Sequence, residues 1–329
     1  MSQVAPTMQM FFTERLTKQR QASPATVRAY RNTFRLLLQF VQQRSGTAPS
    51  ALQWDDLGSK VISAFLDHLE EDRHNAVRSR NTRLAAIRSL YRFAALRHPE
   101  HALLIQQVLA IPLKRYDKAD VSFLEPEEVE ALLAVLDLGS WVGRRDRALM
   151  VLAVQTGLRL SELTGLRCCD VELGTGPHVR CLGKGRKQRC VPLTTATASI
   201  LRVWRQERCG HAEDVLFPNR AGRRLSDDAL EARLVLYKDL AARRCPSLVT
   251  KRLTPHVLRH TCAMNLLREG VDVAVIALWL GHADMHSTNA YLHADMTIKE
   301  RALARTTPIT SKPGRYRPPD SLLAFLEGL

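Results

Sequence analysis

Features that would place a protein in a membrane, a secretory pathway or a disulfide scaffold are missing from this sequence. No run of about eighteen or more apolar residues occurs along the chain, which excludes a membrane-spanning helix. The N-terminal segment lacks the basic, then apolar, then small-residue order of a signal peptide. The seven cysteines are too few for a disulfide framework in 329 residues, and their odd number leaves one unpaired. We therefore expect a cytoplasmic protein whose reduced thiols mostly fill the core.

Acidic residues are scarce relative to basic ones. The chain has 33 Asp and Glu against 48 Lys and Arg, so its formal charge is +15. This excess favours a polyanionic partner, most commonly nucleic acid, and argues against a protein that binds basic partners through an acidic surface. The length predicts two domains, each large enough for its own core. An apolar fraction of 45% is ordinary for a globular protein and argues against a wholly disordered chain.

The N-terminal third predicts a small helical bundle. Ser23 followed by Pro24 is typical of a helix start, and apolar residues recur after it at helical spacing. Further helices are expected over residues 60–70 and 79–96, with a short one after Pro99. Arginines occupy a second face of the first and third helices. One such face is typical of a solvated surface, whereas two in one bundle favour a surface that meets phosphates. The candidate contacts are Arg28, Arg31, Arg35, Arg80, Arg83 and Arg88.

A polar stretch at residues 113–120 divides the chain. We place a linker at 116–123, between an N-terminal domain at 1–115 and a second domain at 124–307, with a tail at 308–329. Lys114 and Arg115, next to this linker, are two further candidate contacts to nucleic acid.

The second domain predicts helices around a small sheet. Helices are expected from Glu125, over 146–156, from Ser161, from Thr195 and over 297–304. Three short strands, 171–173, 178–182 and 188–193, are separated by glycine-rich turns and predict an antiparallel meander. The predicted fold class is therefore mainly α with a small antiparallel β-meander.

Four segments of the second domain carry reactive side chains. They read TGLRLSEL at 156–163, GKGRKQRCVPL at 183–193, HVLRH at 256–260, and LGHAD at 280–284 with a tyrosine nine positions after its histidine. Each is weak evidence alone, because a hairpin lysine or a helical His-x-x-Arg pair is common. The order and combination are much more specific.

Together these segments resemble the tyrosine recombinase (phage integrase) family, over about residues 124–304. Cys262, Asn265 and Trp279 depart from residues common in that family, and none stands at an expected catalytic position. The resemblance implies a helical core-binding domain that contacts DNA, followed by a mixed α/β catalytic domain. It implies site-specific cutting and rejoining of DNA strands, for integration, transposition or resolution of a mobile element.

The resemblance also implies a role for each reactive side chain. Two arginines would clamp the phosphate, because a guanidinium presents a planar charged fork to two oxygens. The lysine would protonate the leaving 5′ oxygen, and one histidine would take the proton of the nucleophile while another binds the phosphate. The tyrosine would form a 3′-phosphotyrosyl link, and a carboxylate would support the first arginine. The two arginines are Arg159 and Arg259, and the lysine is Lys184. His256 would take the proton and His282 would bind the phosphate. The tyrosine is Tyr291, and the supporting carboxylate is that of Glu162.

We expect no metal and no other cofactor, since the phosphotyrosyl bond conserves the energy of the broken bond. The expected partners are double-stranded DNA sites, further copies of the chain in a tetramer, and possible accessory DNA-binding proteins. This implies a protein associated with the nucleoid in the cytoplasm and not with a membrane. Arg186 and Lys187 in the hairpin are further candidate DNA contacts. The apolar segment 322–329 is expected to dock on its own chain or on a neighbouring subunit.

Three alternatives stay open at this point. A type IB topoisomerase would use the same chemistry without exchanging strands. A DNA-binding regulator would use the basic surface without cutting. A metal site could be built from His256 and His260, or from Cys168, Cys169 and Cys181, although the spacings of both sets are unusual for zinc.

Overall fold

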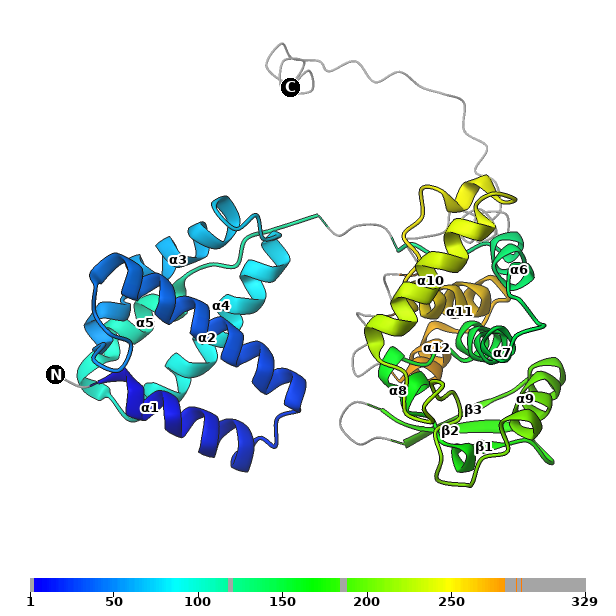
Figure 1. Ribbon diagram of the computed structural model, residues 1–329. Coiled ribbons are helices and arrows are strands. Elements are labelled where there is room, and N and C mark those ends of the chain that lie inside the picture. The colour runs from blue at the N-terminus through cyan, green and yellow to red at the C-terminus, as the bar shows by residue number, and fades with distance from the viewer. Residues whose placement is uncertain (1–2, 118–120, 184–187, 282–287, 289–290, 292–329) are drawn as a thin grey trace, which may run out of the picture. The chain divides into compact units, whose positions relative to one another are not determined.

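The chain folds into two compact units, Met1–Ala119 and Asp120–Leu329 (Figure 1). The computed structural model describes residues 3–117, 121–183, 188–281, 288 and 291. Each unit has a hydrophobic core of its own. None of the helices in the described ranges is long and apolar enough to cross a lipid bilayer.

The first unit is the helical bundle that the spacing of apolar residues predicts. The Ser23 hydroxyl accepts a hydrogen bond from the Thr26 backbone N–H at 3.2 Å, and the helix that follows ends at Gly46, whose φ of 72° is left-handed. The helices expected over 60–70 and 79–96 are confirmed, and their observed ends lie within two residues of these bounds. The elements are α1 (Val4–Met10), the π-helix η1 (Phe11–Gln19), α2 (Pro24–Ser45), η2 (Trp54–Leu57), α3 (Ser59–Glu71), α4 (Val77–Ala94), η3 (Pro99–His101) and α5 (Ala102–Ala110).

Large side chains of this bundle pack inward from four different helices. Phe11, Phe34 and Trp54 are almost fully buried, and the Tyr91 hydroxyl donates a hydrogen bond to the Leu57 carbonyl at 2.5 Å. Because one face of α2 and of α4 is committed to this core, most of their arginines lie outside it.

Arg80 is the exception. The structure shows it to be only 4% exposed, so the expectation that it lies on a basic helix face that meets phosphates is wrong. Its guanidinium donates to the Pro112 carbonyl at 3.0 Å and to the Asn81 side chain at 3.1 Å, and its Nε lies 3.8 Å from Glu70. Arg80 thus ties the segment after α5 to α4 and α3.

The second unit contains the predicted meander among helices. Strands β1 (Val171–Glu172), β2 (His178–Leu182) and β3 (Gln188–Pro192) pair antiparallel in the order β1-β2-β3, with Val179 opposite Val191. This confirms the three-stranded antiparallel arrangement. The helices are α6 (Pro126–Ala134), α7 (Trp141–Thr156), α8 (Leu160–Gly165), α9 (Thr195–Arg208), α10 (Asp227–Ala241), α11 (Pro255–Arg268) and α12 (Val273–Leu280), with short 3₁₀ turns η4 (Cys168–Asp170) and η5 (Pro246–Leu248).

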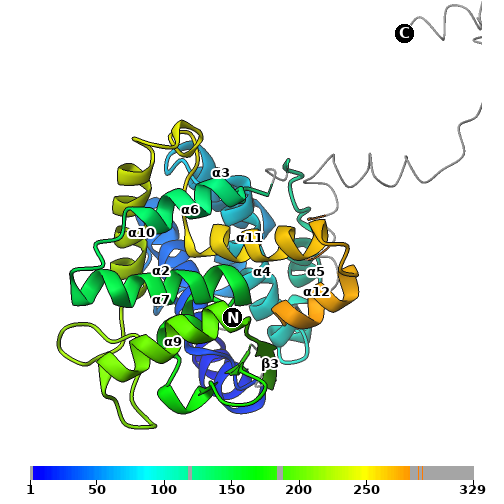
Figure 2. The ribbon, with the colours of Figure 1, turned by 90° about the vertical axis from the view of Figure 1, so that its right-hand side faces the viewer.

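Helix α7 is central to the second unit. It packs against α9 on one side and against α11 on the other, where the two helices run side by side (Figure 2). It ends at Gly157, whose φ is 61°. A Cβ at Gly157 would meet the Leu280 side chain at 2.5 Å and Cys262 at 3.2 Å, so the chain can turn here only without a side chain. This turn brings the start of α8, the middle of α11 and the end of α12 together.

Candidate active site

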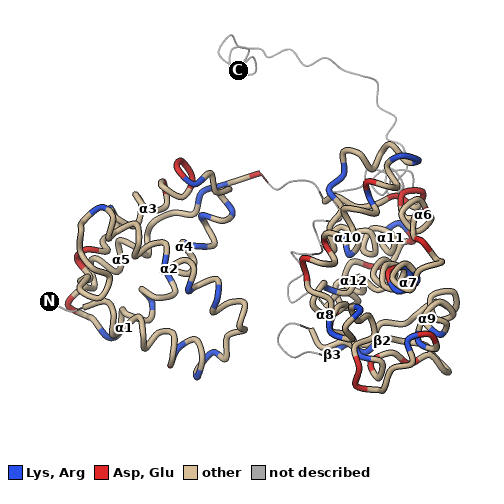
Figure 3. The backbone as a smooth tube through the Cα atoms, in the orientation of Figure 1, with Lys and Arg blue, Asp and Glu red and all other residues tan. Residues whose placement is uncertain are grey.

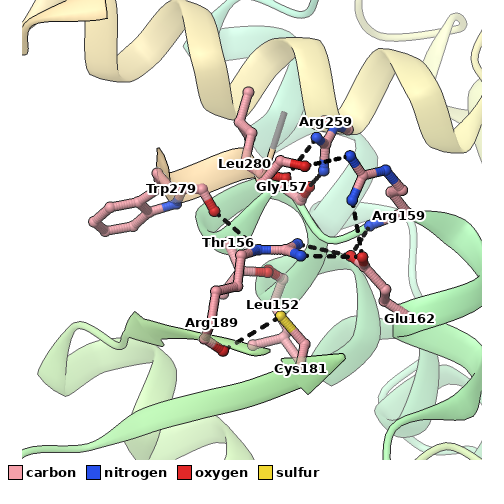
Figure 4. A network of polar contacts seen from close by, with 11 residues as sticks. Leu152, Thr156, Gly157, Arg159, Glu162, Cys181, Arg189, Arg259, Trp279 and Leu280 are labelled. Carbon is pink, nitrogen blue, oxygen red and sulfur yellow. Dashed lines mark hydrogen bonds and ion pairs between the residues drawn. The ribbon is translucent and has the colours of Figure 1, made fainter. Parts of the chain in front are cut away.

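Two arginines from distant segments meet at the turn that ends α12 (Figure 4). Arg259, from the buried face of α11, donates to the Leu280 carbonyl at 2.7 Å and to the Gly157 carbonyl at 2.5 Å. Arg159, which precedes α8, donates to the next carbonyl along the turn, that of Gly281, at 2.6 Å. Consecutive carbonyl groups therefore hold the two guanidinium groups side by side.

Glu162 supports Arg159, as the sequence predicted. Its carboxylate accepts from the Arg159 side chain at 3.0 Å and from the Arg159 backbone N–H at 2.8 Å. The carboxylate also accepts two hydrogen bonds from Arg189 on β3, at 3.0 and 2.7 Å. Burial acts to raise the pKa of Glu162, but the hydrogen bonds from Arg189 and the Arg159 backbone bring its pKa below the usual range. Glu162 is therefore ionised at neutral pH.

The site carries an excess of positive charge. Three guanidinium groups, of Arg159, Arg189 and Arg259, surround the one negative charge of Glu162. Burial, reinforced by the charge of Arg159, lowers the pKa of Arg259 to about 10. Arg259 stays cationic at neutral pH, and an anion placed beside it would relieve the repulsion between the arginines.

Tyr291 is buried beside this cluster. Only 2% of it is exposed, and it packs with Met264 of α11 and Ile276 of α12. Burial raises the pKa of Tyr291, while the positive charge of Arg259 acts in the opposite direction. Arg259 is thus near enough to act on the phenol electrostatically, and the hydroxyl is protonated at neutral pH in this arrangement.

The histidine at the Tyr291 hydroxyl is His260. Its Nδ1 lies 3.0 Å from the hydroxyl oxygen, whereas His256 is exposed and its ring lies 6.4 Å, centroid to centroid, from that of His260. Burial lowers the pKa of His260 to about 4, and the charges of His256 and Arg259 add to the effect. The imidazole is therefore neutral at neutral pH. Sequence reasoning assigned no part in the reaction to His260, although it closes the HVLRH segment.

The sequence analysis also assigned no part in the site to Arg189. It lies in the segment GKGRKQRCVPL, two positions beyond Lys187, and strand alternation alone does not indicate what it contacts. Its guanidinium joins β3 to Glu162 and, through Nε, to the Trp279 carbonyl at 3.1 Å. Lys184, Arg186, Lys187, His282, the helix expected over 297–304 and the tail from 308 lie outside the described residues.

The basic residues predicted on the first unit have different surroundings. Arginines recur along α4 with no acidic residue between them (Figure 3). Arg28, Arg31, Arg35 and Arg115 are exposed. Arg83 and Arg88 are partly buried; Arg88 donates to the Ile111 carbonyl, and burial lowers the pKa of both. The Nζ of Lys114 lies 2.6 Å from a carboxylate oxygen of Glu70 and 3.8 Å from one of Asp67, so the charge of Lys114 is balanced within the unit.

Known proteins resemble this chain along nearly its whole length. The sequence pattern described as the phage integrase family matches residues 122–297, and that of the phage integrase N-terminal SAM-like domain matches residues 11–98. The Sinorhizobium fredii protein named "Putative integrase/recombinase y4rC" is 50% identical over 326 residues, which cover 99% of this chain and 98% of the relative. Tyrosine recombinase XerD of Pseudomonas putida is 32% identical over 86% of this chain and 91% of its own.

Solved structures share the fold. The Tn1549 transposon integrase in complex with transposon right end DNA superposes with a TM-score of 0.69 at 16% identity, covering 90% of this chain and 98% of that one. The XerH recombinase bound to a palindromic difH substrate has a TM-score of 0.66 at 22% identity, covering 87% of this chain and 81% of that one.

Proposed function

This chain belongs to the phage integrase family and is a site-specific tyrosine recombinase, and from this premise we propose that Tyr291 is the nucleophile that breaks a strand of double-stranded DNA. The phenolic oxygen attacks the phosphorus, a 3′-phosphotyrosyl ester forms, and the bond to the 5′ oxygen breaks. The phenol loses its proton and the 5′ oxygen gains one. A 5′ hydroxyl from another strand reverses these steps and seals the new junction.

The observation that carries this proposal is the pair of guanidinium groups at the turn that ends α12, together with the buried Tyr291 on which Arg259 acts electrostatically. Arg159 and Arg259 each use two of their five N–H groups on described partners. The other donors of these two arginines have no hydrogen-bond partner among the described residues. We assign them to the non-bridging oxygens, whose negative charge grows as phosphorus becomes five-coordinate. Because the carbonyls of Gly157, Leu280 and Gly281 already hold both groups, little reorganisation is needed when DNA binds.

The proton of Tyr291 leaves through the imidazole pair. His256 is the proton acceptor that the family resemblance implies, and the contact of His260 with the hydroxyl makes His260 the group through which the proton passes. An imidazole with a pKa near 4 is too weak a base to take the proton from a phenol of raised pKa. A phosphate anion bound between the arginines raises the pKa of nearby imidazoles, so DNA binding precedes activation.

The other assignments rest on the resemblance for Lys184 and His282, and on the pattern of basic residues for the DNA contacts. Lys184 protonates the leaving 5′ oxygen, and His282 donates a hydrogen bond to the phosphate. Arg186 and Lys187 contact DNA near the cut, and the first unit binds flanking duplex through the exposed Arg28, Arg31, Arg35 and Arg115 together with Arg83, Arg88 and Lys114. The two units correspond to a DNA-binding domain and a catalytic domain, joined near residues 116–123.

We assign the reaction to the movement of a mobile element within the nucleoid, by integration or transposition. The Sinorhizobium fredii relative carries the words integrase and recombinase in its name, and the Tn1549 protein, which shares the fold, is a transposon integrase. Accessory DNA-binding proteins would add to site selection.

Exchange between two duplexes requires four active sites, so we propose a tetramer on DNA. The apolar segment 322–329 is then a contact to a neighbouring subunit. Truncation after Arg317 should weaken tetramer assembly and spare binding to a single site, as measured by native gel mobility. Unchanged tetramer assembly would contradict the contact.

Covalent capture tests the proposal. The protein is incubated with nicked genomic fragments, denatured in SDS, and the DNA that stays bound is sequenced. We expect an SDS-resistant adduct whose 3′ ends define one site, and none with Tyr291→Phe, which keeps the ring and lacks the hydroxyl. Absence of an adduct with the wild type, or an adduct with Tyr291→Phe, rejects Tyr291 as the nucleophile and leaves a DNA-binding regulator as the better description.

Strand exchange separates recombination from a topoisomerase. Two duplexes that carry the captured site and different labels should yield hybrid products. Relaxation of supercoiled DNA with no hybrid products would favour the type IB topoisomerase instead.

A further inference from the structure

We infer that Arg189 is a positioning residue that holds the arginine clamp, Arg159 and Arg259, in its phosphate-binding geometry; the inference rests on the proposed function. Its side chain leaves β3 and makes three directed contacts. Nη1 and Nη2 donate to the two oxygens of Glu162, at 3.0 and 2.7 Å, and Nε donates to the Trp279 carbonyl at 3.1 Å. Arg189 thus uses every nitrogen of its guanidinium on the protein (Figure 4).

The contact with Glu162 reaches one arginine of the clamp. The carboxylate oxygen that accepts Nη1 of Arg189 also accepts Nη1 of Arg159, and the other oxygen accepts the Arg159 backbone N–H. The side chain of Glu162 is only 5% exposed and that of Arg189 only 11%. Glu162 is therefore held from both sides, and its orientation depends on Arg189 as much as on Arg159.

The contact with α12 reaches the other arginine. Trp279 immediately precedes Leu280 and Gly281, whose carbonyls receive Arg259 and Arg159. Arg189 also packs closely against this turn, since a Cβ at Gly281 would lie 2.9 Å from its Nη1. One side chain consequently connects β3, the start of α8 and the end of α12, the places from which both arginines of the clamp are held.

The role requires arginine rather than any cation. Only a planar fork can engage both carboxylate oxygens of Glu162 while a third nitrogen reaches Trp279. A lysine would keep the buried positive charge but could satisfy one of these partners at a time. Removal of the group would leave the buried carboxylate held from one side and able to turn with Arg159.

Single-turnover cleavage of a nicked duplex carrying the captured site tests the inference. The wild type is compared with Arg189→Lys and Arg189→Gln, and with Arg180→Gln on the adjacent strand as a control. Arg180 is exposed, and its side chain donates to the Cys169 carbonyl, away from Glu162 and Trp279. We expect Arg189→Gln to reduce the cleavage rate by about 10–10²-fold, the size that a small misplacement of catalytic groups produces. Arg189→Lys should recover little, and Arg180→Gln should match the wild type.

A methylphosphonate at the cut site separates positioning of the clamp from a general structural defect. This linkage is neutral, so its cleavage depends less on the alignment of two guanidinium groups. The defect of Arg189→Gln should shrink on it at least several-fold. The ratio of the two rates is measured within one variant and is independent of the fraction that folds. Equal defects on both linkages would overturn the inference.

Two further results would also overturn it. A 5′-bridging phosphorothiolate leaves without needing a proton, so rescue of Arg189→Gln by this substrate would assign Arg189 to the lysine hairpin instead. Glu162→Gln combined with Arg189→Gln should cleave no more slowly than the slower single variant, whereas additive losses of rate would show that Arg189 does not act through Glu162.

Failure of the inference can be distinguished from failure of the proposed function. If the wild type forms no adduct, the proposed function fails and this inference with it. A wild-type adduct with unchanged rates in Arg189→Gln rejects this inference alone.

Discussion

The two units use arginine in opposite ways. On α2, Arg28, Arg31 and Arg35 are exposed, and none has a carboxylate partner in the part of the chain that the structure describes. In the second unit, Arg259 is buried and Arg189 is mostly shielded, and they donate to backbone carbonyls and to a carboxylate. An exposed cation contributes a field that salt screens, whereas a held one offers donors already in place. We therefore expect the exposed arginines to contribute mainly to DNA affinity and the held ones mainly to the rate of cleavage.

Arg259→Gln should produce the largest effect of this comparison. Cleavage at saturating DNA should fall by about 10²–10³-fold, because a preorganised donor to the transition state is removed. Single-turnover adduct formation on the captured site measures it. Arg31→Gln is the control and should cleave at the wild-type rate once DNA is saturating. A loss of cleavage rate below about tenfold for Arg259→Gln would contradict the difference in arginine use between the two units.

Arg80→Met should act on stability, although Arg80 belongs to the unit of exposed arginines. The change leaves the Pro112 carbonyl and part of the Glu70 charge without a partner, which should lower the free energy of unfolding by about 2–3 kcal/mol. Urea unfolding monitored by circular dichroism measures it. If instead DNA affinity falls while stability is unchanged, Arg80 contacts DNA after all.

Acid should destabilise the second unit through His260. Its pKa is about 4 in the folded chain and about 6.5 when unfolded, so between these values the unfolded chain binds a proton that the folded chain does not. The free energy of unfolding should therefore fall as the pH drops from about 6.5 to about 4, by about 1–2 kcal/mol for this partly exposed group.

The matching variant for that measurement is His260→Gln. In this variant, the fall in the free energy of unfolding that His260 causes at low pH should be absent. Urea unfolding at pH 7 and pH 4.5 measures it. Identical pH dependence in the two proteins would show that His260 is not the group responsible.

Arg31→Gln should give the smallest effect. One lost phosphate contact should lower the slope of log affinity against log salt by about 0.9 and weaken binding several-fold. Fluorescence anisotropy with duplex DNA at several salt concentrations measures it. Arg167→Gln is the comparison, because Arg167 is also exposed but already paired with Glu213. Equal slopes for the wild type, Arg31→Gln and Arg167→Gln would show that Arg31 of α2 does not contact DNA.

Local chemistry explains why much of the fold could be predicted. A Ser-Pro start and apolar residues at helical spacing act over a few residues. They predicted the start of α2, and both ends of α3 and α4 to within two residues. The alternating strands between glycine-rich turns predicted the order of the sheet. The pairing of Glu162 with Arg159 spans three positions of one segment and could also be predicted.

Contacts between distant segments could not be predicted in this way. Arg189 meets Glu162 across 27 positions, and His260 meets Tyr291 across 31. The burial of Arg80 depends on a segment 32 positions further along. Neither periodicity nor charge indicates which of several arginines or histidines will face a given carboxylate or hydroxyl.

By itself, the sequence determined the formal charge of the chain, the starts of several helices with both ends of α3 and α4, and the set of residues from which a phosphate-cleaving site could be built, because these depend on residue type and near neighbours. Only the tertiary structure decided which arginines form hydrogen bonds inside the protein and which histidine contacts the Tyr291 hydroxyl. The reason is that burial makes a polar group find a partner, and the partner within reach is set by how helices pack and not by how the chain runs.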